Sequence, residues 1–233
     1  MTLSAGRKTL SFVLKLIVTV SAVLGIVLSV RGGRAAFMGG GSAFMFFTIQ
    51  SNIAIALVCA AGAVLMMSGR KVRNGWFAVK FVFTVAITLT GLVFCFVLAP
   101  TMKAKAWNAQ NILTHVIVPA AAVADFFTAG ICGELRKRSV LLVTLPPLAY
   151  VIYAGIAYIE GWEFLKGVRY PYFFLNWGSP AGAFGFTREL PFMGCAWWIL
   201  ALLLLLLGVG RVYLVILRGL RKRALERQER ITE

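Results

Sequence analysis

Histidine and aspartate are almost absent from this chain of 233 residues, which has one histidine, His115, and one aspartate, Asp125. The four cysteines lie far apart and form no CxxC pair. A zinc site or a disulfide framework needs such residues in number and at characteristic spacings. The scarcity therefore argues against both, and we expect neither a metal nor another cofactor. A Gly-rich phosphate cradle is also not expected, because the glycines at 39–41 lack the preceding strand and the GK[ST] pattern.

Long polar segments are missing too, since 60% of the residues are apolar and the mean hydropathy is +0.86. The apolar residues come in runs, without the stripe of a surface helix or the alternation of a strand. Each run is long enough for a hydrocarbon core of about 30 Å. We number them as spans 1 to 6: residues 10–30, 44–67, 76–99, 109–131, 139–159 and 191–217. The sequence thus predicts an all-α polytopic membrane protein with one six-span domain over residues 1–233.

Acidic residues are few, 8 against 24 lysines and arginines. Such a balance can suggest nucleic acid, but the positions of the basic residues indicate membrane topology instead. Most of those in the connections lie on the side that also holds both termini: Arg7, Lys8, Arg70, Lys71, Arg73, Arg136, Lys137, Arg138 and the tail from Arg218. We therefore predict cytoplasmic termini, a multi-pass protein of the cell inner (plasma) membrane, and no nucleic-acid partner.

Two features of the basic residues follow from this topology. Lys15, Lys80 and Arg211 fall within spans but near their cytoplasmic ends, where long side chains can snorkel to water. The basic tail is a candidate contact for anionic lipid headgroups, and plain topology anchoring is the simpler interpretation.

Polar residues interrupt span 2 near its outer end, in the stretch from Phe46 to Ala56. Hydrocarbon offers polar groups no water, so each needs a partner within the protein or a function. Helical spacing puts Ser51 and Asn52 on the face of Thr48, whereas Gln50 points elsewhere. Taken alone, the stretch is also typical of a helix N-cap.

Span 4 carries the single histidine. Asn108, Asn111 and His115 share one helical face, and Pro119 predicts a kink beside the imidazole. Asp125 lies about 15 Å deeper at the helical rise, so we expect it to form a buried salt bridge or interhelical hydrogen bond instead of orienting His115.

Thr48 and His115 lie at similar depths below the outer ends of spans that run in the same direction. We therefore expect their side chains to meet as a nucleophile and its base. The aromatic-rich connection from Glu160 to Leu190 is long enough to act as a lid over a site between spans 2 and 4.

These residues resemble a known family. Phe-Thr-Ile-Gln-Ser-Asn around Thr48, His115 followed by Pro119 and Asp125, and Tyr-Pro-Tyr-Phe-Phe-Leu-Asn at 170–176 are similar to motifs of bacterial members of the androgen-induced-gene family, which includes the androgen-dependent TFPI-regulating protein. The resemblance covers essentially the whole chain. It implies a membrane hydrolase of fatty acid esters of hydroxy fatty acids, with Thr48 as nucleophile and His115 as base. Phe173 and Asn176 depart from the bacterial string, which reads closer to Tyr-Pro-Tyr-Pro-Phe-Leu-Asp, so an acidic role does not carry over to that loop.

The sequence therefore predicts an intramembrane lipid ester hydrolase with a Thr-His dyad near the outer leaflet, acting on a membrane lipid or fatty acyl ester. Candidates for binding substrate or stabilising the oxyanion are Ser51, Asn52, Asn111 and Asn176. The alternative is a small transporter or lipid-binding scaffold with a polar site between spans 2 and 4.

Overall fold

The protein is described by a computed structural model that covers residues 3–33, 37–69 and 74–232. Arg34, Arg70, Lys71 and Arg73, four basic residues of the first two connections, lie outside these ranges. Six of the helices described are long and apolar enough to cross a membrane, which confirms an all-α, multi-pass membrane protein.

The first two membrane helices are continuous: α1 (Ala5–Arg31) and α2 (Phe47–Met67). The third and fourth each change helix type at a π-helical turn. In order, they are α3 (Asn74–Val93), η2 (Phe94–Leu98) and α4 (Ala99–Met102), then α5 (Ala109–Ile112), η4 (Leu113–Ile117) and α6 (Val118–Ala129). The fifth begins as the 3-10 helix η6 (Lys137–Thr144) and continues as α7 (Leu145–Ile159), and the sixth is α8 (Cys195–Thr232).

Short 3-10 segments fill some of the connections: η1 (Gly40–Met45), η3 (Lys103–Ala106), η5 (Gly130–Cys132) and η7 (Phe173–Leu175). The second membrane helix starts at Phe47, three residues later than expected, because η1 precedes it. The sixth starts at Cys195 rather than Pro191. Backbone bonds from Gly194 to Gly185 and from Thr187 to Phe192 keep the preceding residues in a hairpin.

Both π-helical turns stand two residues before a proline, Pro100 or Pro119. Proline has no N–H, and its ring crowds the carbonyl four residues earlier, so a wider turn relieves the strain within the helix. The third membrane helix therefore continues past Pro100 to Met102, beyond the end at residue 99 that the sequence predicts for span 3. The turns also face each other, since the rings of Phe94 and His115 stack with centroids 3.9 Å apart.

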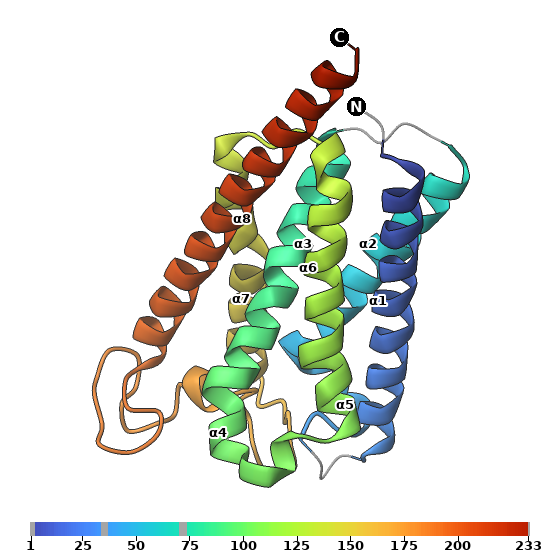
Figure 1. Ribbon diagram of the computed structural model, residues 1–233. Helices are drawn as coiled ribbons and strands as arrows, with labels where there is room; N and C mark the ends of the chain where they lie inside the picture. Colours follow the sequence, from blue (N-terminus) through green and yellow to red (C-terminus); the bar gives the residue numbers. More distant parts are fainter. Residues whose placement is uncertain (1–2, 34–36, 70–73, 233) are drawn as a thin grey trace.

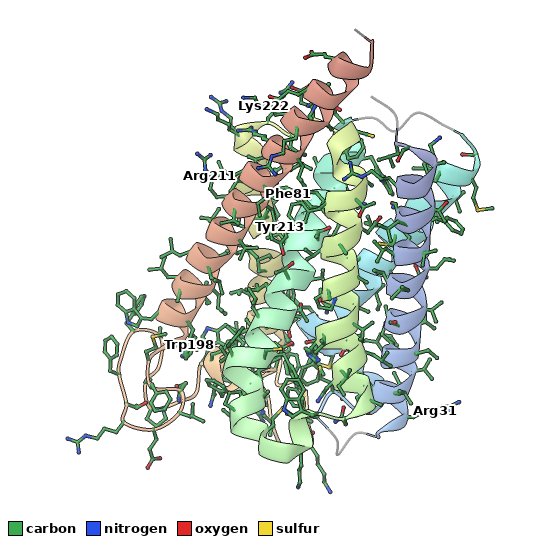
Figure 2. All side chains as sticks on the ribbon, in the orientation of Figure 1. Arg31, Phe81, Trp198, Arg211, Tyr213 and Lys222 are labelled. Atoms are coloured by element: carbon green, nitrogen blue, oxygen red, sulfur yellow. The ribbon has the colours of Figure 1, made fainter. Side chains whose placement is uncertain are left out.

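Both termini lie at one end of the bundle, and the connections after α1, α4 and α7 lie at the other (Figure 1). We call these the terminal end and the loop end. Lys222 lies towards the terminal end and Arg31 at the loop end (Figure 2). Helix α1 packs against α2 and α6, α3 also packs against α2 and α6, and α8 crosses the outside of the bundle along η6 and α3 (Figure 1).

A buried ion cluster joins α1, α3 and α6. The carboxylate of Asp125 lies 2.7 Å from Nζ of Lys15 and 2.6 Å from Nζ of Lys80, and it accepts a 2.5 Å hydrogen bond from the hydroxyl of Ser11. The buried salt bridge expected for Asp125 is confirmed. The expectation that Lys15 and Lys80 snorkel to water is wrong, because the single carboxylate draws both ammonium groups inward, and they are only 4% and 3% exposed. Arg211 is exposed.

Candidate functional site

Thr48 is the second residue of α2, at the loop end of the bundle, and its side chain is 3% exposed. Its Oγ1 lies 3.2 Å from Nε2 of His115, which projects from the π-helical turn η4. The predicted meeting of the hydroxyl and the imidazole is therefore confirmed. The two groups are 67 residues apart in the chain. Thr48 lies in the first turn of α2, and His115 lies in the second turn of the fourth membrane helix.

The partners of the other ring nitrogen define the protonation of His115. Nδ1 lies 3.1 Å from the backbone carbonyl of Asn111 and 3.0 Å from Oγ1 of Thr114. The Thr114 hydroxyl donates its own proton to the carbonyl of Gln110, so it offers Nδ1 only a lone pair. Because both partners accept, the neutral ring carries its proton on Nδ1. Nε2 is then free to accept from Thr48, which is the tautomer that a general base needs.

The imidazole is held in a dry environment. His115 is 2% exposed, and the ring of Phe94 lies nearly parallel to it at an interplanar angle of 22°. An aromatic face carries partial negative charge, so this stacking favours the ring when it becomes positive. Asp125 bonds to the lysines and Ser11 and does not take part in orienting the histidine.

A third residue contacts Thr48 from the connection between α7 and α8. The phenol oxygen of Tyr172 lies 3.4 Å from Oγ1 of Thr48 and accepts a 3.3 Å hydrogen bond from the backbone N–H of the same residue. That N–H belongs to the first turn of α2, where amides have no partner within the helix. Burial raises the pKa of Tyr172 from its usual value of 10 to about 12. The motif at 170–176, which contains Tyr172, is part of the family resemblance, but the sequence predicts no role for this tyrosine.

The polar neighbours proposed for the oxyanion lie beside the dyad but bond to backbone. Ser51 donates to the carbonyl of Thr48 and lies 2.8 Å from Oγ1 of Thr90. The amide of Asn52 donates to the carbonyls of Thr48 and Thr114, at 2.8 and 3.1 Å. It therefore ties α2 to η4 and helps to hold the nucleophile and the base at one depth.

The two remaining candidates lie further from the hydroxyl. The side-chain amide of Asn111 donates to the carbonyl of Ala106, and it is the backbone of this residue that orients His115. Asn176 accepts from the backbone N–H of Gly178 in a turn of the connection before α8. Among the described residues, two side chains lie within hydrogen-bonding distance of the Thr48 hydroxyl: His115 and Tyr172.

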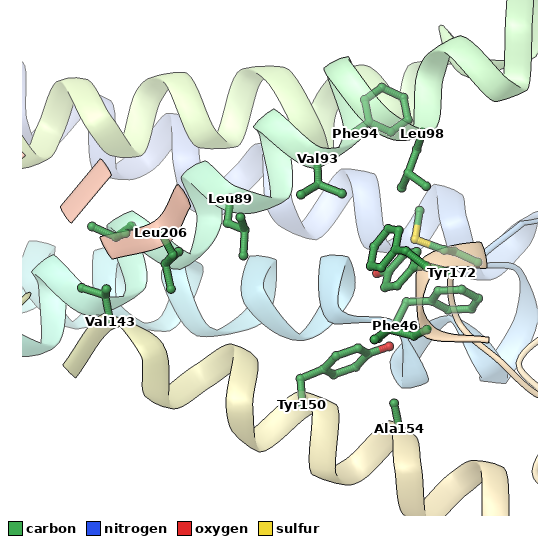
Figure 3. Packing of buried hydrophobic residues seen from close by; sticks show 14 of the residues in the cluster. Phe46, Leu89, Val93, Phe94, Leu98, Val143, Tyr150, Ala154, Tyr172 and Leu206 are labelled. Carbon is green, nitrogen blue, oxygen red and sulfur yellow. The ribbon is translucent and has the colours of Figure 1, made fainter. Parts of the chain in front are cut away.

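An apolar pocket opens beside Thr48, with an empty volume of about 630 Å³ including its mouth. Figure 3 shows Leu89, Val93 and Leu98 on one side and Tyr150 on the other, with Tyr172 towards one end. The lining is Phe47, Thr48, Leu89, Thr90, Val93, Leu98, Pro147, Tyr150, Val151, Tyr172, Phe174, Leu175, Ile199, Leu202 and Leu203.

The pocket lies between α2, α3, α7 and α8, and not between spans 2 and 4 as expected. The side-chain amide of Asn52 holds the second and fourth membrane helices together on that side. His115 does not line the pocket. The hydroxyl of Thr48 therefore stands between the imidazole on one side and the apolar space on the other. Within the described ranges, no three His, Cys, Asp or Glu side chains gather to form a metal site.

No protein-family model, curated protein or solved structure matches this chain.

Proposed function

We propose that this protein is an intramembrane hydrolase of lipid carboxylic esters, with Thr48 as nucleophile and His115 as general base. One observation carries the proposal: the Thr48 hydroxyl donates to the basic nitrogen of a buried imidazole and also lines an apolar pocket. A hydroxyl with a base behind it and an apolar space before it is arranged to attack the acyl carbon of a fatty acyl ester.

The reaction proceeds in two stages. Nε2 of His115 takes the proton of Thr48 as Oγ1 bonds to the ester carbonyl carbon, and the resulting tetrahedral intermediate expels the alcohol, which takes that proton from the imidazolium. The product of this stage is an acyl ester of Thr48. A water molecule, deprotonated by His115, then attacks the acyl carbon, and the fatty acid leaves as Thr48 regains its proton.

The imidazolium formed in each stage has no carboxylate partner. Its Nδ1–H faces the carbonyl of Asn111 and the hydroxyl oxygen of Thr114, and its face lies against Phe94. Neutral acceptors stabilise a cation less than a carboxylate does. We therefore expect a slower enzyme than one with a full Ser-His-Asp triad.

The pocket indicates how substrate enters. Its walls include α7 and α8. Only 28% and 17% of the residues in the most apolar segments of the fifth and sixth membrane helices are buried, so these two helices lie at the outside of the bundle. An acyl chain can enter from the bilayer between these helices, with its ester at the loop end beside Thr48. The surplus of basic residues at the terminal end favours a cytoplasmic position for that end in the plasma membrane, which puts the site in the outer leaflet.

The proposal extends to family and partners. The motif around Thr48 and the motif of His115 support membership of the androgen-induced-gene family that the sequence resembles. The basic residues of α8 beyond Leu217, including Arg221 and Lys222, are proposed to contact anionic lipid headgroups.

Activity-based labelling tests the proposal. Detergent-solubilised protein is treated with a fluorophosphonate that carries an alkyl chain, and the labelled peptide is identified by mass spectrometry. We expect the label on Thr48, and its loss in Thr48→Ala and His115→Ala. Ser51→Ala is the matched control, because this hydroxyl lies one turn away and contacts Thr90 instead of a base.

Equal labelling of Thr48→Ala, His115→Ala and the natural protein contradicts the proposal. So does a natural protein that binds long-chain acyl esters in this pocket but neither labels nor hydrolyses them. That second result favours a lipid-binding scaffold.

A further inference from the structure

Among the residues that the structure describes, two side chains contact the Thr48 hydroxyl, those of His115 and Tyr172. The proposed reaction of Thr48 and His115 gives Tyr172 no role. This tyrosine reaches α2 from a connection 124 residues away in the chain. Its ring is held by aromatic neighbours: Phe174 stacks on it at 5.0 Å and an angle of 9°, and Phe46 meets it edge-on at 5.9 Å. The hydroxyl is therefore positioned by packing and not by a solvent-exposed loop.

The protons around Thr48 can be assigned one at a time. The hydroxyl proton of Thr48 points to Nε2 of His115, because that nitrogen is the acceptor of the ring. The backbone N–H of Thr48 donates to the phenol oxygen of Tyr172. The phenol proton can then point towards Oγ1 of Thr48, at the long distance of 3.4 Å, and the hydroxyl of Tyr150 is a second polar neighbour of the phenol. Tyr172 thus has a weakly engaged proton beside the oxygen that attacks.

The position of the pocket gives that proton a second acceptor. Thr48 and Tyr172 both line the pocket, so an ester that approaches Oγ1 from there brings its carbonyl oxygen to the side of the phenol. Donors that stabilise an oxyanion lie about 3 Å from it. A hydroxyl 3.4 Å from the attacking oxygen is within reach of the carbonyl oxygen on the carbon being attacked.

We propose that Tyr172 is a catalytic residue, whose hydroxyl donates a hydrogen bond to the ester carbonyl oxygen as Thr48 attacks and negative charge develops there. The inference rests on the proposed hydrolase function. No bond is made or broken at the phenol, which keeps its proton throughout. The backbone N–H of Thr48 holds the phenol oxygen in place and polarises its O–H group.

The burial of Tyr172 agrees with a donor role. Its pKa of about 12 keeps the phenol neutral at any ordinary assay pH, so it does not act as a base. The simpler alternative is that the tyrosine only caps the first turn of α2. A cap contributes to stability, whereas an oxyanion donor acts on the transition state alone.

The test compares Tyr172→Phe with Tyr213→Phe. Tyr213 is a half-buried tyrosine of α8 that does not line the pocket, and its hydroxyl lies 3.1 Å from Oγ1 of Thr88. We expect Tyr172→Phe to lower kcat on a long-chain acyl ester by on the order of 10²-fold with little change in KM. Tyr213→Phe should retain the kcat of the natural protein.

A pair of ligands separates chemistry from binding. A long-chain alkyl trifluoromethyl ketone forms an oxyanion on Thr48, whereas the matching alkyl ether fills the pocket without forming one. Tyr172→Phe should lose affinity for the ketone by a factor close to its loss in kcat and keep its affinity for the ether. Equal losses for both ligands, or an unchanged kcat, overturn the inference.

Two further results keep the test decisive. If Tyr172→Phe does not fold, Tyr172→3-fluorotyrosine retains the ring and the hydroxyl but has a more acidic phenol. The alkaline loss of kcat should then move to lower pH, a shift that a capping role does not produce. If Thr48→Ala abolishes turnover while Tyr172→Phe leaves it intact, this inference fails and the proposed function stands; a natural protein without turnover or labelling refutes the proposed function itself.

Discussion

The buried cluster of Asp125, Lys15 and Lys80 has two positive groups for one negative group, and this imbalance predicts an unusual order of mutational effects. Each ammonium lies within 2.7 Å of the carboxylate, and all three residues are at most 4% exposed. Asp125→Asn leaves two buried cations facing each other with no counter-charge. Lys15→Met instead leaves a neutral pair, because Lys80 keeps its contact of 2.6 Å with the carboxylate.

The magnitudes follow from the environment of the charges. Removing the partner of a buried charge costs about 3–5 kcal/mol, and here two charges lose one partner. For a chain of this length, about 2–4 °C of melting temperature corresponds to each kcal/mol, so Asp125→Asn should melt roughly 6–20 °C lower. Ser11→Ala removes the hydrogen bond to the carboxylate and the one that Ser11 accepts from Lys15, and should cost about 2 kcal/mol. The loss of stability in Lys15→Met should be similar to that in Ser11→Ala.

Thermal unfolding in detergent micelles measures this order. A triple variant with Asp125→Leu, Lys15→Met and Lys80→Met should melt within a few degrees of the natural protein, since replacing a whole buried ionic cluster by apolar residues is close to neutral. An Asp125→Asn variant that melts at the temperature of the natural protein, or a Lys15→Met variant as unstable as Asp125→Asn, would contradict the role of the carboxylate as the shared counter-charge.

The remaining predictions concern the site. Gly91→Ala puts a methyl group 2.9 Å from the carbonyl of His115, so α3 must move from the π-helical turn and kcat should fall at least about tenfold. Gly75→Ala, with no atom within 4 Å of the added carbon, is its control, and equal rates for the two contradict the argument. Leu203→Trp fills the pocket and should raise KM for long acyl esters while short esters react as before; an unchanged chain-length profile counts against acyl binding there. Burial raises the pKa of Tyr172 to about 12, so the phenol keeps its proton at pH 10. We therefore expect kcat to show no alkaline decline near pH 10. A decline centred at pH 10 in the natural protein that is absent in Tyr172→Phe would contradict it.

The class of the protein and the depth of its polar residues can be predicted from the amino-acid sequence. The length of an apolar run and the helical rise per residue are properties of each segment alone, so the six membrane helices follow from hydropathy. The same rise put Thr48 and His115 at one level and Asp125 too deep to assist them. The contact between Thr48 and His115 and the ion cluster of Asp125 agree with these predicted depths.

The surroundings of these residues depend on how the helices pack in three dimensions. Helical periodicity gives the face of a side chain, but the rotation of each helix and its distance from its neighbours depend on packing between distant segments. Lys15 and Lys80 therefore turned inward, the π-helical turns brought Phe94 onto His115, and the pocket opened towards α7 and α8. Tyr172 reached Thr48 because the aromatic connection folds back over the start of α2, and no local pattern in the chain encodes that return.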